Sequence, residues 1–243
     1  LTSLISGEGD VNLKAYTEIL TEEYNRFLGA SPRVQVINTL MFSILTMLGA
    51  TLLAFIAAYA LNTISTTSRA RITVRRLLII FTLIPMASSN ITFALGLLRT
   101  FGNTLMKADN VWMAIVLVHI LVAFPFANRS ISAILEAQNP EYRQIAATLG
   151  SSRLRTLVKV ELPLILPGII AAATFSFAIS MGEFGATYFI SSPKYSTISV
   201  GIYRFLDMRQ MQSAAAMAVL LITVCTIAFL IIEKLGRVER ILG

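Results

Sequence analysis

The stretch Asn139–Gly168, NPEYRQIAATLGSSRLRTLVKVELPLILPG, is a charged segment between two long apolar runs. Asn139 is a good N-cap, and Pro140 suits the first helical position, where its missing N–H leaves no hydrogen bond unmade. Apolar residues then recur at helical spacing, which predicts one apolar face on a short helix: Tyr142, Ile145, Ala146 and Leu149. Gly150 is placed to end this helix in the left-handed conformation.

A second, basic helix is expected after the glycine corner. Ser152 can cap this helix, which carries Arg153, Arg155 and Lys159 before Pro163 marks the start of the next apolar run. Two short helices joined by a tight corner and tethered between apolar runs suit insertion into a partner protein. From composition alone, the plainer alternative is a solvated connector between two membrane spans.

The composition predicts a membrane protein. The chain is 56% hydrophobic and 14% charged, with a mean hydropathy of +0.73, whereas soluble domains are about 45–50% apolar and about 25% charged. The net charge of +7 lies in loops between apolar runs, where orientation signals belong, so we expect no nucleic-acid partner. The single cysteine, Cys225, excludes an internal disulfide, and the single histidine, His119, disfavours a histidine-based metal centre.

Five apolar runs predict an all-α fold, a polytopic membrane helix bundle in contact with the lipid bilayer. The runs cover residues 36–61, 77–98, 111–128, 162–182 and 211–232. The first run carries no charge and can cross ~30 Å of hydrocarbon with some tilt. Within it, Ala50, Ala54 and Ala58 recur every four residues, a spacing that lets helices approach closely. Pro163 and Pro167 are expected to bend the fourth run near its start.

The arginines after the first run predict the orientation of the chain. Arg69, Arg71, Arg75 and Arg76 come without an acidic residue, which is typical of a cytoplasmic loop. If this loop is cytoplasmic and each apolar run crosses the membrane once, the loops between runs alternate between its two sides. Twelve of the twenty Lys and Arg residues then lie on the cytoplasmic side, with the C-terminus cytoplasmic and the N-terminus outside. Residues 1–33, which are net acidic, are then an extracytoplasmic polar segment with a short helix over 12–28. The sequence shows no basic leader before an apolar core, so we expect no signal peptide. Because it begins with Leu1 and not with Met, we also expect it to be a piece of a longer polypeptide.

A second candidate site is the stretch Met181–Thr187, MGEFGAT, at the outer end of the fourth run. A carboxylate there is costly unless it faces water or a partner. Glycines let the backbone leave helical geometry, which is tolerated at membrane depth only beside a cavity. We therefore predict that a pathway or gate is formed by Gly182, Glu183, Phe184 and Gly185. The alternative is that Glu183 only caps an interfacial turn.

Asn90, in the second run, and His119, in the third, are weaker pathway candidates, with buried packing as the alternative for each. The motifs of common enzyme sites are missing from the sequence. It has no GxxxxGK[ST], so the chain is not expected to bind ATP phosphates itself, and it has neither HExxH nor GxSxG. The sequence therefore predicts no catalytic residue, no metal site and no cofactor of its own.

The charged segment also resembles a known signature. Permease subunits of binding-protein-dependent ABC importers carry E-A-A, three residues, Gly, nine residues and then I-x-L-P. Here Gly150 is followed, nine residues later, by Val160-Glu161-Leu162-Pro163, which fits the spacing. The E-A-A positions fall on Gln144, Ile145 and Ala146, so only the last alanine is kept. The lost carboxylate should change the polar contacts of the loop while the helix and turn remain.

This resemblance implies a type I importer permease of a prokaryotic inner or plasma membrane, without catalytic activity of its own. It implies a separate ABC ATPase subunit, in two copies, that binds ATP and is coupled to the chain through the coupling loop, residues 139–161. A surface cleft of this subunit would receive the helix Pro140–Leu149. It also implies a second permease half and an extracytoplasmic substrate-binding protein. The coupling residues would be Glu141, Tyr142, Gln144, Ile145, Ala146, Leu149, Gly150, Arg153, Leu162 and Pro163.

Two shorter stretches suggest finer assignments. The residues around Glu183 resemble importers of iron(III), thiamine, sulfate or molybdate, and polyamines, and Ser191–Tyr203 is most similar to the iron(III) and thiamine branches. The opening Asn38-Thr39-Leu40 resembles the C-terminal half of a fused two-repeat permease. A membrane scaffold that uses the same loop for another partner, and an intramembrane enzyme, remain the alternatives from other functional classes.

Overall fold

The computed structural model describes residues 30–64, 69–105, 110–139 and 141–242, and within these ranges the chain forms helices and no strand. The all-α prediction is therefore confirmed for the described part of the chain. Most of the predicted extracytoplasmic segment, including the helix expected over 12–28, lies outside the described residues, as does Pro140.

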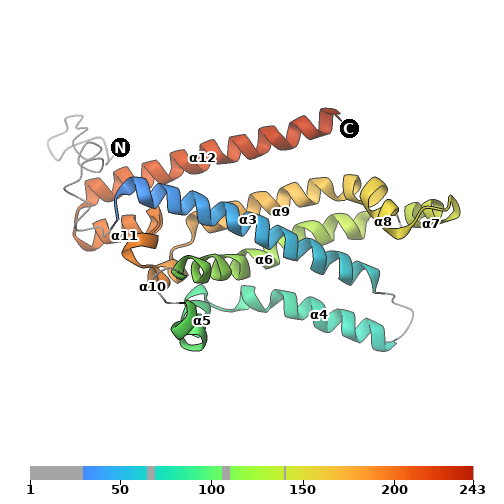
Figure 1. Ribbon diagram of the computed structural model, residues 1–243, viewed down its shortest axis with the longest axis horizontal. Helices are drawn as coiled ribbons and strands as arrows, with labels where there is room; N and C mark the ends of the chain where they lie inside the picture. Colours follow the sequence, from blue (N-terminus) through green and yellow to red (C-terminus); the bar gives the residue numbers. More distant parts are fainter. Residues whose placement is uncertain (1–29, 65–68, 106–109, 140, 243) are drawn as a thin grey trace. The chain divides into compact units, whose positions relative to one another are not determined.

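Figure 1 labels the α-helices in chain order, and a short π turn (η2) and a 3₁₀ turn (η3) lie between them. The elements are α3 (Pro32–Thr63), α4 (Arg69–Ala87), α5 (Asn90–Leu105), α6 (Val111–Ala137), α7 (Glu141–Thr148), α8 (Arg153–Thr156), η2 (Leu157–Glu161), α9 (Leu162–Gly182), α10 (Gly185–Ile190), η3 (Pro193–Tyr195), α11 (Ile198–Asp207) and α12 (Met211–Leu242).

Among the described residues, four helices are long and apolar enough to cross a membrane. They are α3, α6, the continuous helix Arg153–Gly182, and the part of α12 over Met211–Ile232. Helices α4 and α5 would make a fifth span if they are counted as one broken crossing. This range agrees with the predicted bundle of about five membrane helices.

The second predicted run, residues 77–98, is not one helix. It is divided between α4, which ends at Ala87, and α5, which begins at Asn90. Pro85 removes one backbone donor just before the break, and the following Ser88, Ser89 and Asn90 have side chains that compete for backbone hydrogen bonds. The helix that contains the third run, α6, continues past residue 128 to Ala137. The helix therefore runs through Arg129 without a break.

The described residues fall into two compact units. The first unit takes its residues from 1–46, 88–119 and 177–243, and the second from 47–87 and 120–176. Helices α3, α6 and α9 each contribute residues to both units. Residues 139–161 belong to the second unit and the stretch around Glu183 belongs to the first.

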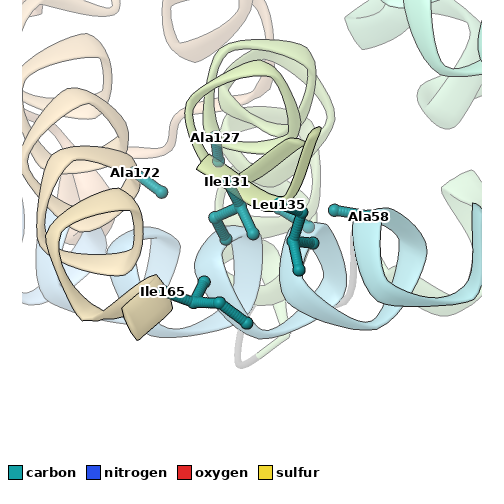
Figure 2. Packing of buried hydrophobic residues seen from close by; sticks show 7 residues of the cluster. Ala58, Ala127, Ile131, Leu135, Ile165 and Ala172 are labelled. Carbon is teal, nitrogen blue, oxygen red and sulfur yellow. The ribbon is translucent and has the colours of Figure 1, made fainter. Parts of the chain in front are cut away.

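The core of the second unit is built from small and branched apolar residues of α3, α6 and α9. Figure 2 shows side chains of this cluster gathered between the three helices; its buried members are Ala54, Ala58, Ala127, Ile131, Leu135, Ile165 and Ala172. The predicted alanine row is confirmed as a packing face, because Ala50, Ala54 and Ala58 are all buried. At Gly168 a Cβ would lie 3.2 Å from the carbonyl oxygen of Ser130, so α9 and α6 approach closely there.

In the first unit, α11 packs against α12 around a buried cluster: Ile198, Phe205, Ala214, Ala216 and Met217. Two residues of α3 fasten the segment that leads into α11. The side-chain amide of Asn38 donates to the carbonyl oxygens of Lys194 (3.0 Å) and Ser196 (2.9 Å). Thr39 Oγ1 accepts from the backbone N–H of Ile198 at 3.0 Å. Asn38 and Thr39 therefore hold α3 against the segment that leads into α11.

Candidate functional site

Helix α7 is capped at its start by Asn139. The Oδ1 atom of Asn139 accepts a hydrogen bond from the backbone N–H of Glu141 at 3.0 Å, and its amide donates to Glu141 Oε2 at 3.0 Å. The backbone N–H of Tyr142 bonds to the carbonyl oxygen of Asn139. These bonds satisfy donors at the helix start that have no partner within the helix, so the predicted N-cap is confirmed.

The other end of α7 closes on Gly150. This residue has a φ of +74°, the left-handed conformation that the sequence predicted. Its N–H bonds to the carbonyl of Ala147, and the N–H of Ser151 bonds to the carbonyl of Ala146, each at 3.0 Å. This pair of bonds is a complete Schellman motif. Ser152 then caps α8 by accepting from the N–H of Arg155.

The apolar face of α7 divides into a buried residue and an exposed row. Ala146 is buried in the second unit, whereas Tyr142, Ile145 and Leu149 are 49%, 55% and 81% exposed. Leu154 and Val158, further along the chain, are also exposed. Gln144 and Arg153 are exposed as well. A row of large exposed apolar side chains on a helix of eight residues is a surface suited to a protein partner.

Arg143 fixes α7 to the rest of the second unit. Its Nε donates to Glu161 Oε1 in a short ion pair, and Glu161 is buried. The guanidinium of Arg143 also lies over the ring of Tyr59 in α3, 5.5 Å from the ring centroid. Sequence reasoning assigned no role to Arg143, Glu161 or Tyr59. The available signal was Glu161 itself, since a carboxylate that adjoins an apolar run requires a partner.

The basic helix and the fourth span form one continuous helix, Arg153–Gly182, and not two helices with a boundary at Leu162. Within it, η2 is a π turn, and the N–H of Leu162 bonds back to the carbonyl of Leu157. The turn ends at Glu161, two residues before Pro163, whose ring in a regular α-helix would press on the carbonyl four residues earlier. Leu162 and Pro163 therefore lie inside the helix.

In the first unit, Glu183 caps α10. Its carboxylate accepts hydrogen bonds from the backbone N–H groups of Ala186 and Thr187, each at 3.0 Å, and from the hydroxyl of Thr187 at 2.8 Å. The amide of Asn90 in α5 donates to the same carboxylate at 3.3 Å. The side chain of Glu183 is almost fully buried. The structure thus brings together Asn90 and Glu183, two of the predicted pathway residues.

His119 of α6 joins the same network. Its Nε2 lies 2.7 Å from Thr187 Oγ1 and 3.4 Å from Glu183 Oε2, and its Nδ1 lies 2.7 Å from Ser180 Oγ. Because the Thr187 hydroxyl gives its hydrogen to Glu183, the Nε2 atom of His119 must carry a hydrogen to donate to Thr187. Ser180 in turn contacts Thr46 of α3 at 3.3 Å. The network therefore links five helices within the first unit.

The other members of the predicted gate lie around this network. Gly182 is exposed, and a Cβ at Gly185 would make only ordinary contacts with Ile91 and Glu183. The ring of Phe184 lies 5.4 Å from that of Tyr188 and 5.0 Å from that of Tyr203, and the latter two rings are 4.8 Å apart. This aromatic trio, Phe184, Tyr188 and Tyr203, is partly exposed. Sequence reasoning did not single out the two tyrosines.

Comparison with known families gives one match over most of the chain. Residues 50–238 match the model of the binding-protein-dependent transport system inner membrane component. The matched part includes α7, its glycine corner and Glu183 with its partners Asn90, His119 and Thr187, and it extends into α12.

Curated relatives are transport system permease proteins. The chain is 28% identical over 160 residues to PhnV of Salmonella paratyphi A, a permease named for 2-aminoethylphosphonate transport. This alignment covers 66% of this chain and 59% of PhnV. It is 37% identical over 133 residues to the molybdenum transport permease ModB of Escherichia coli K12, covering 53% of this chain and 58% of ModB. It is 34% identical over 114 residues to the sulfate transport permease CysT of Salmonella typhimurium, covering 46% and 41%. The chain thus matches less than two thirds of each relative's length.

Among solved structures, a bacterial ABC transporter involved in the import of the acidic polysaccharide alginate has a similar fold. The TM-score is 0.76 at 18% identity, and the match covers 97% of this chain and 87% of that one. The same kind of transporter in complex with an alginate-bound periplasmic protein gives a TM-score of 0.70 at 20% identity.

Proposed function

Since the chain belongs to the family of binding-protein-dependent transport system inner membrane components, we propose that it is the transmembrane permease half of an ATP-driven type I importer. It passes a small solute from an extracytoplasmic binding protein to the cytoplasm. A second permease half, homologous or fused, completes the pathway. A separate ATPase in two copies supplies the energy through the loop 139–161. The membrane is the inner or plasma membrane of a prokaryote, with the C-terminus of the chain in the cytoplasm.

The observation that supports ATPase binding is the exposed row Tyr142, Ile145 and Leu149 on a helix fixed at both ends. Free exposure of these side chains to water is unfavourable by about 25 cal/mol per Å² of apolar surface. A cleft on the ATPase that receives α7 would remove this surface from water. The pair formed by Arg143 and Glu161 would then carry movement of α7 into the helix Arg153–Gly182.

Copurification of the ATPase tests this proposal. The double substitution Ile145→Ala and Leu149→Ala should reduce the amount of ATPase that copurifies by about tenfold or more, because each large apolar anchor at the centre of an interface contributes on the order of 1–2 kcal/mol. Ile80→Ala is the matched control, since Ile80 in α4 is 59% exposed but lies outside the coupling loop. Equal retention of the ATPase by the double variant and the control would contradict the proposal.

At the other candidate site, we infer that Glu183 shapes the outer gate indirectly. Its carboxylate is occupied by Ala186, Thr187 and Asn90, so its role is to position α10 and not to contact solute. The aromatic trio Phe184, Tyr188 and Tyr203 offers partly exposed surface that begins at the residue after Glu183, and it is the better candidate for contact with the solute.

The substrate is a separate proposal. The resemblance of Ser191–Tyr203 favours iron(III) or thiamine, whereas the names of the relatives favour the alternative of an oxyanion such as sulfate or molybdate, or a phosphonate. We give preference to the oxyanion class, because several relatives named for such substrates match the chain. Thermal stabilisation of the copurifying outer receptor by molybdate, sulfate, 2-aminoethylphosphonate, Fe³⁺ or thiamine would separate these classes. Stabilisation by Fe³⁺ or thiamine alone would reject the oxyanion proposal.

A further inference from the structure

The second unit contains a cavity of about 80 Å³ bounded by α3, α4 and α6. A cavity needs roughly 10–15 Å³ of such volume to hold one water molecule, so this cavity has room for roughly five to eight groups of that size. That is the size of a phosphate group with its substituent atoms. None of the proposed coupling or gate residues lines it.

Two arginines and one carboxylate line the cavity. Arg75 is already engaged, because its Nη2 lies 3.3 Å from Glu136 Oε1 and its Nε donates to the carbonyl oxygen of Leu61 at 3.3 Å. Arg129 also lines the cavity and is exposed, and it forms no ion pair with any residue that the structure describes. The Arg129 guanidinium therefore remains available for an anionic group at the cavity.

The buried side chain of Asn128 requires a hydrogen-bond donor from whatever occupies the cavity. The residue is only 6% exposed, and its amide nitrogen donates to Thr82 Oγ1 at 3.5 Å. Its Oδ1 atom is buried and accepts no hydrogen bond from the described residues. A buried carbonyl oxygen without a donor costs free energy, so a ligand that also carries an O–H or N–H group would complete the site.

From these observations we propose that the cavity binds a phosphate group with a neighbouring hydrogen-bond donor, the phosphate on Arg129 and the donor on Asn128. A phospholipid headgroup such as phosphatidylglycerol has this chemistry, and so does free hydrogen phosphate. The surroundings fit a lipid. Leu83 of α4 lines the cavity and is itself exposed, and the same helix carries further exposed apolar side chains, Leu77, Ile80 and Phe81. Basic cavities between membrane helices on the cytoplasmic side bind such headgroups, and the arginines of α4 predict that side here.

The test uses the purified transporter complex in nanodiscs of phosphatidylcholine, with and without phosphatidylglycerol. A separate arm in detergent adds inorganic phosphate alone. Phosphatidylcholine carries the phosphate without an O–H or N–H donor, so it is the matched lipid. We expect phosphatidylglycerol to raise the thermal midpoint of the wild-type complex and to be retained in native mass spectrometry. If inorganic phosphate alone gives the same rise, free phosphate is the source.

Arg129→Gln should weaken this binding by about tenfold or more, since it removes a charge-assisted hydrogen bond. Asn128→Leu should abolish the preference for phosphatidylglycerol over phosphatidylcholine. The matched control is Arg76→Gln, an exposed arginine of α4 that does not line the cavity. The proposal is overturned if Arg76→Gln and Arg129→Gln have equal effects. It is also overturned if neither phosphatidylglycerol nor phosphate changes the midpoint of the wild-type complex.

Discussion

Arg143 in α7 donates a hydrogen bond to Glu161, the last residue of the π turn, and this ion pair joins α7 to the helix Arg153–Gly182. Glu161 is buried, so its charge depends on Arg143 for compensation. The pair therefore links a surface that we propose for ATPase binding to a helix that crosses the membrane.

Replacing one residue of the Arg143–Glu161 pair should destabilise the second unit more than replacing both residues. Arg143→Met leaves a buried carboxylate unpaired and is expected to destabilise the second unit by roughly 3 kcal/mol. The double variant Arg143→Met and Glu161→Met should recover much of that loss, because two apolar side chains leave no buried charge. Thermal unfolding in detergent measures both variants. Strictly additive effects would show that the two residues are not coupled.

The effect of a substitution at Gly150 should depend on how well the new residue tolerates a positive φ. No atom lies within 4 Å of an added Cβ, so a small side chain there encounters strain from the φ of +74° and not a clash. We expect Gly150→Ala to cost about 1–2 kcal/mol of local stability, with Gly150→Arg reducing ATPase copurification further. Gly150→Asn is the control, since asparagine tolerates this conformation. Membrane insertion should be unchanged in all three variants, and unchanged uptake by Gly150→Arg would contradict the coupling proposal.

Glu183→Gln distinguishes a structural role from a direct role in transport. The amide keeps the size of the side chain but places N–H donors against the N–H groups of Ala186 or Thr187. We expect a loss of about 2 kcal/mol in stability, the cost of a buried donor left unpaired, together with a loss of uptake. Thermal unfolding and uptake should be measured on the same preparation. Full stability with lost uptake would instead indicate that Glu183 contacts the solute.

Gly201→Ala should disturb the packing of α11 on α3. An added Cβ would lie 2.2 Å from Oε1 of Gln35, which is fully buried and has little room to move. We expect a loss of about 1–3 kcal/mol in stability, typical of overpacking. The double variant Gln35→Ala and Gly201→Ala removes the side chain that the added Cβ would clash with, so its thermal midpoint should be restored. No recovery in the double variant would mean that the loss has another cause.

Much of the architecture could be predicted from the sequence, because local chemistry determined it. Asn139 and Gly150 define the ends of α7 through capping alone, and uninterrupted apolar length identified the membrane helices. The break at Ser88 and Ser89 was missed, because hydropathy continues through it while the backbone does not. Apolar runs report burial in lipid and carry little information about helix continuity.

The site residues were harder to predict, because their partners are distant in the chain. Glu183 was identified from its cost in an apolar setting, but its binding to His119 and Asn90 depends on contacts across α6 and α5. Likewise, Arg143 gave no signal alone, and only its contact with Glu161 explains why a charge stands beside Leu162-Pro163. Sequence spacing singled out residues 139–161, which we propose as the coupling loop, whereas the residues that fasten this segment could be identified only in the structure.

The π turn Leu157–Glu161 has a mechanical consequence for the helix it interrupts. Such a turn accommodates one residue more than an α-turn, so its return to regular geometry would rotate the helix on one side by about 100° relative to the other. If the proposed ATPase displaces α7, this change would add axial rotation to the movement of the helix Arg153–Gly182. In that case the faces that this helix presents to its neighbours would be exchanged while its depth in the bilayer stayed nearly constant.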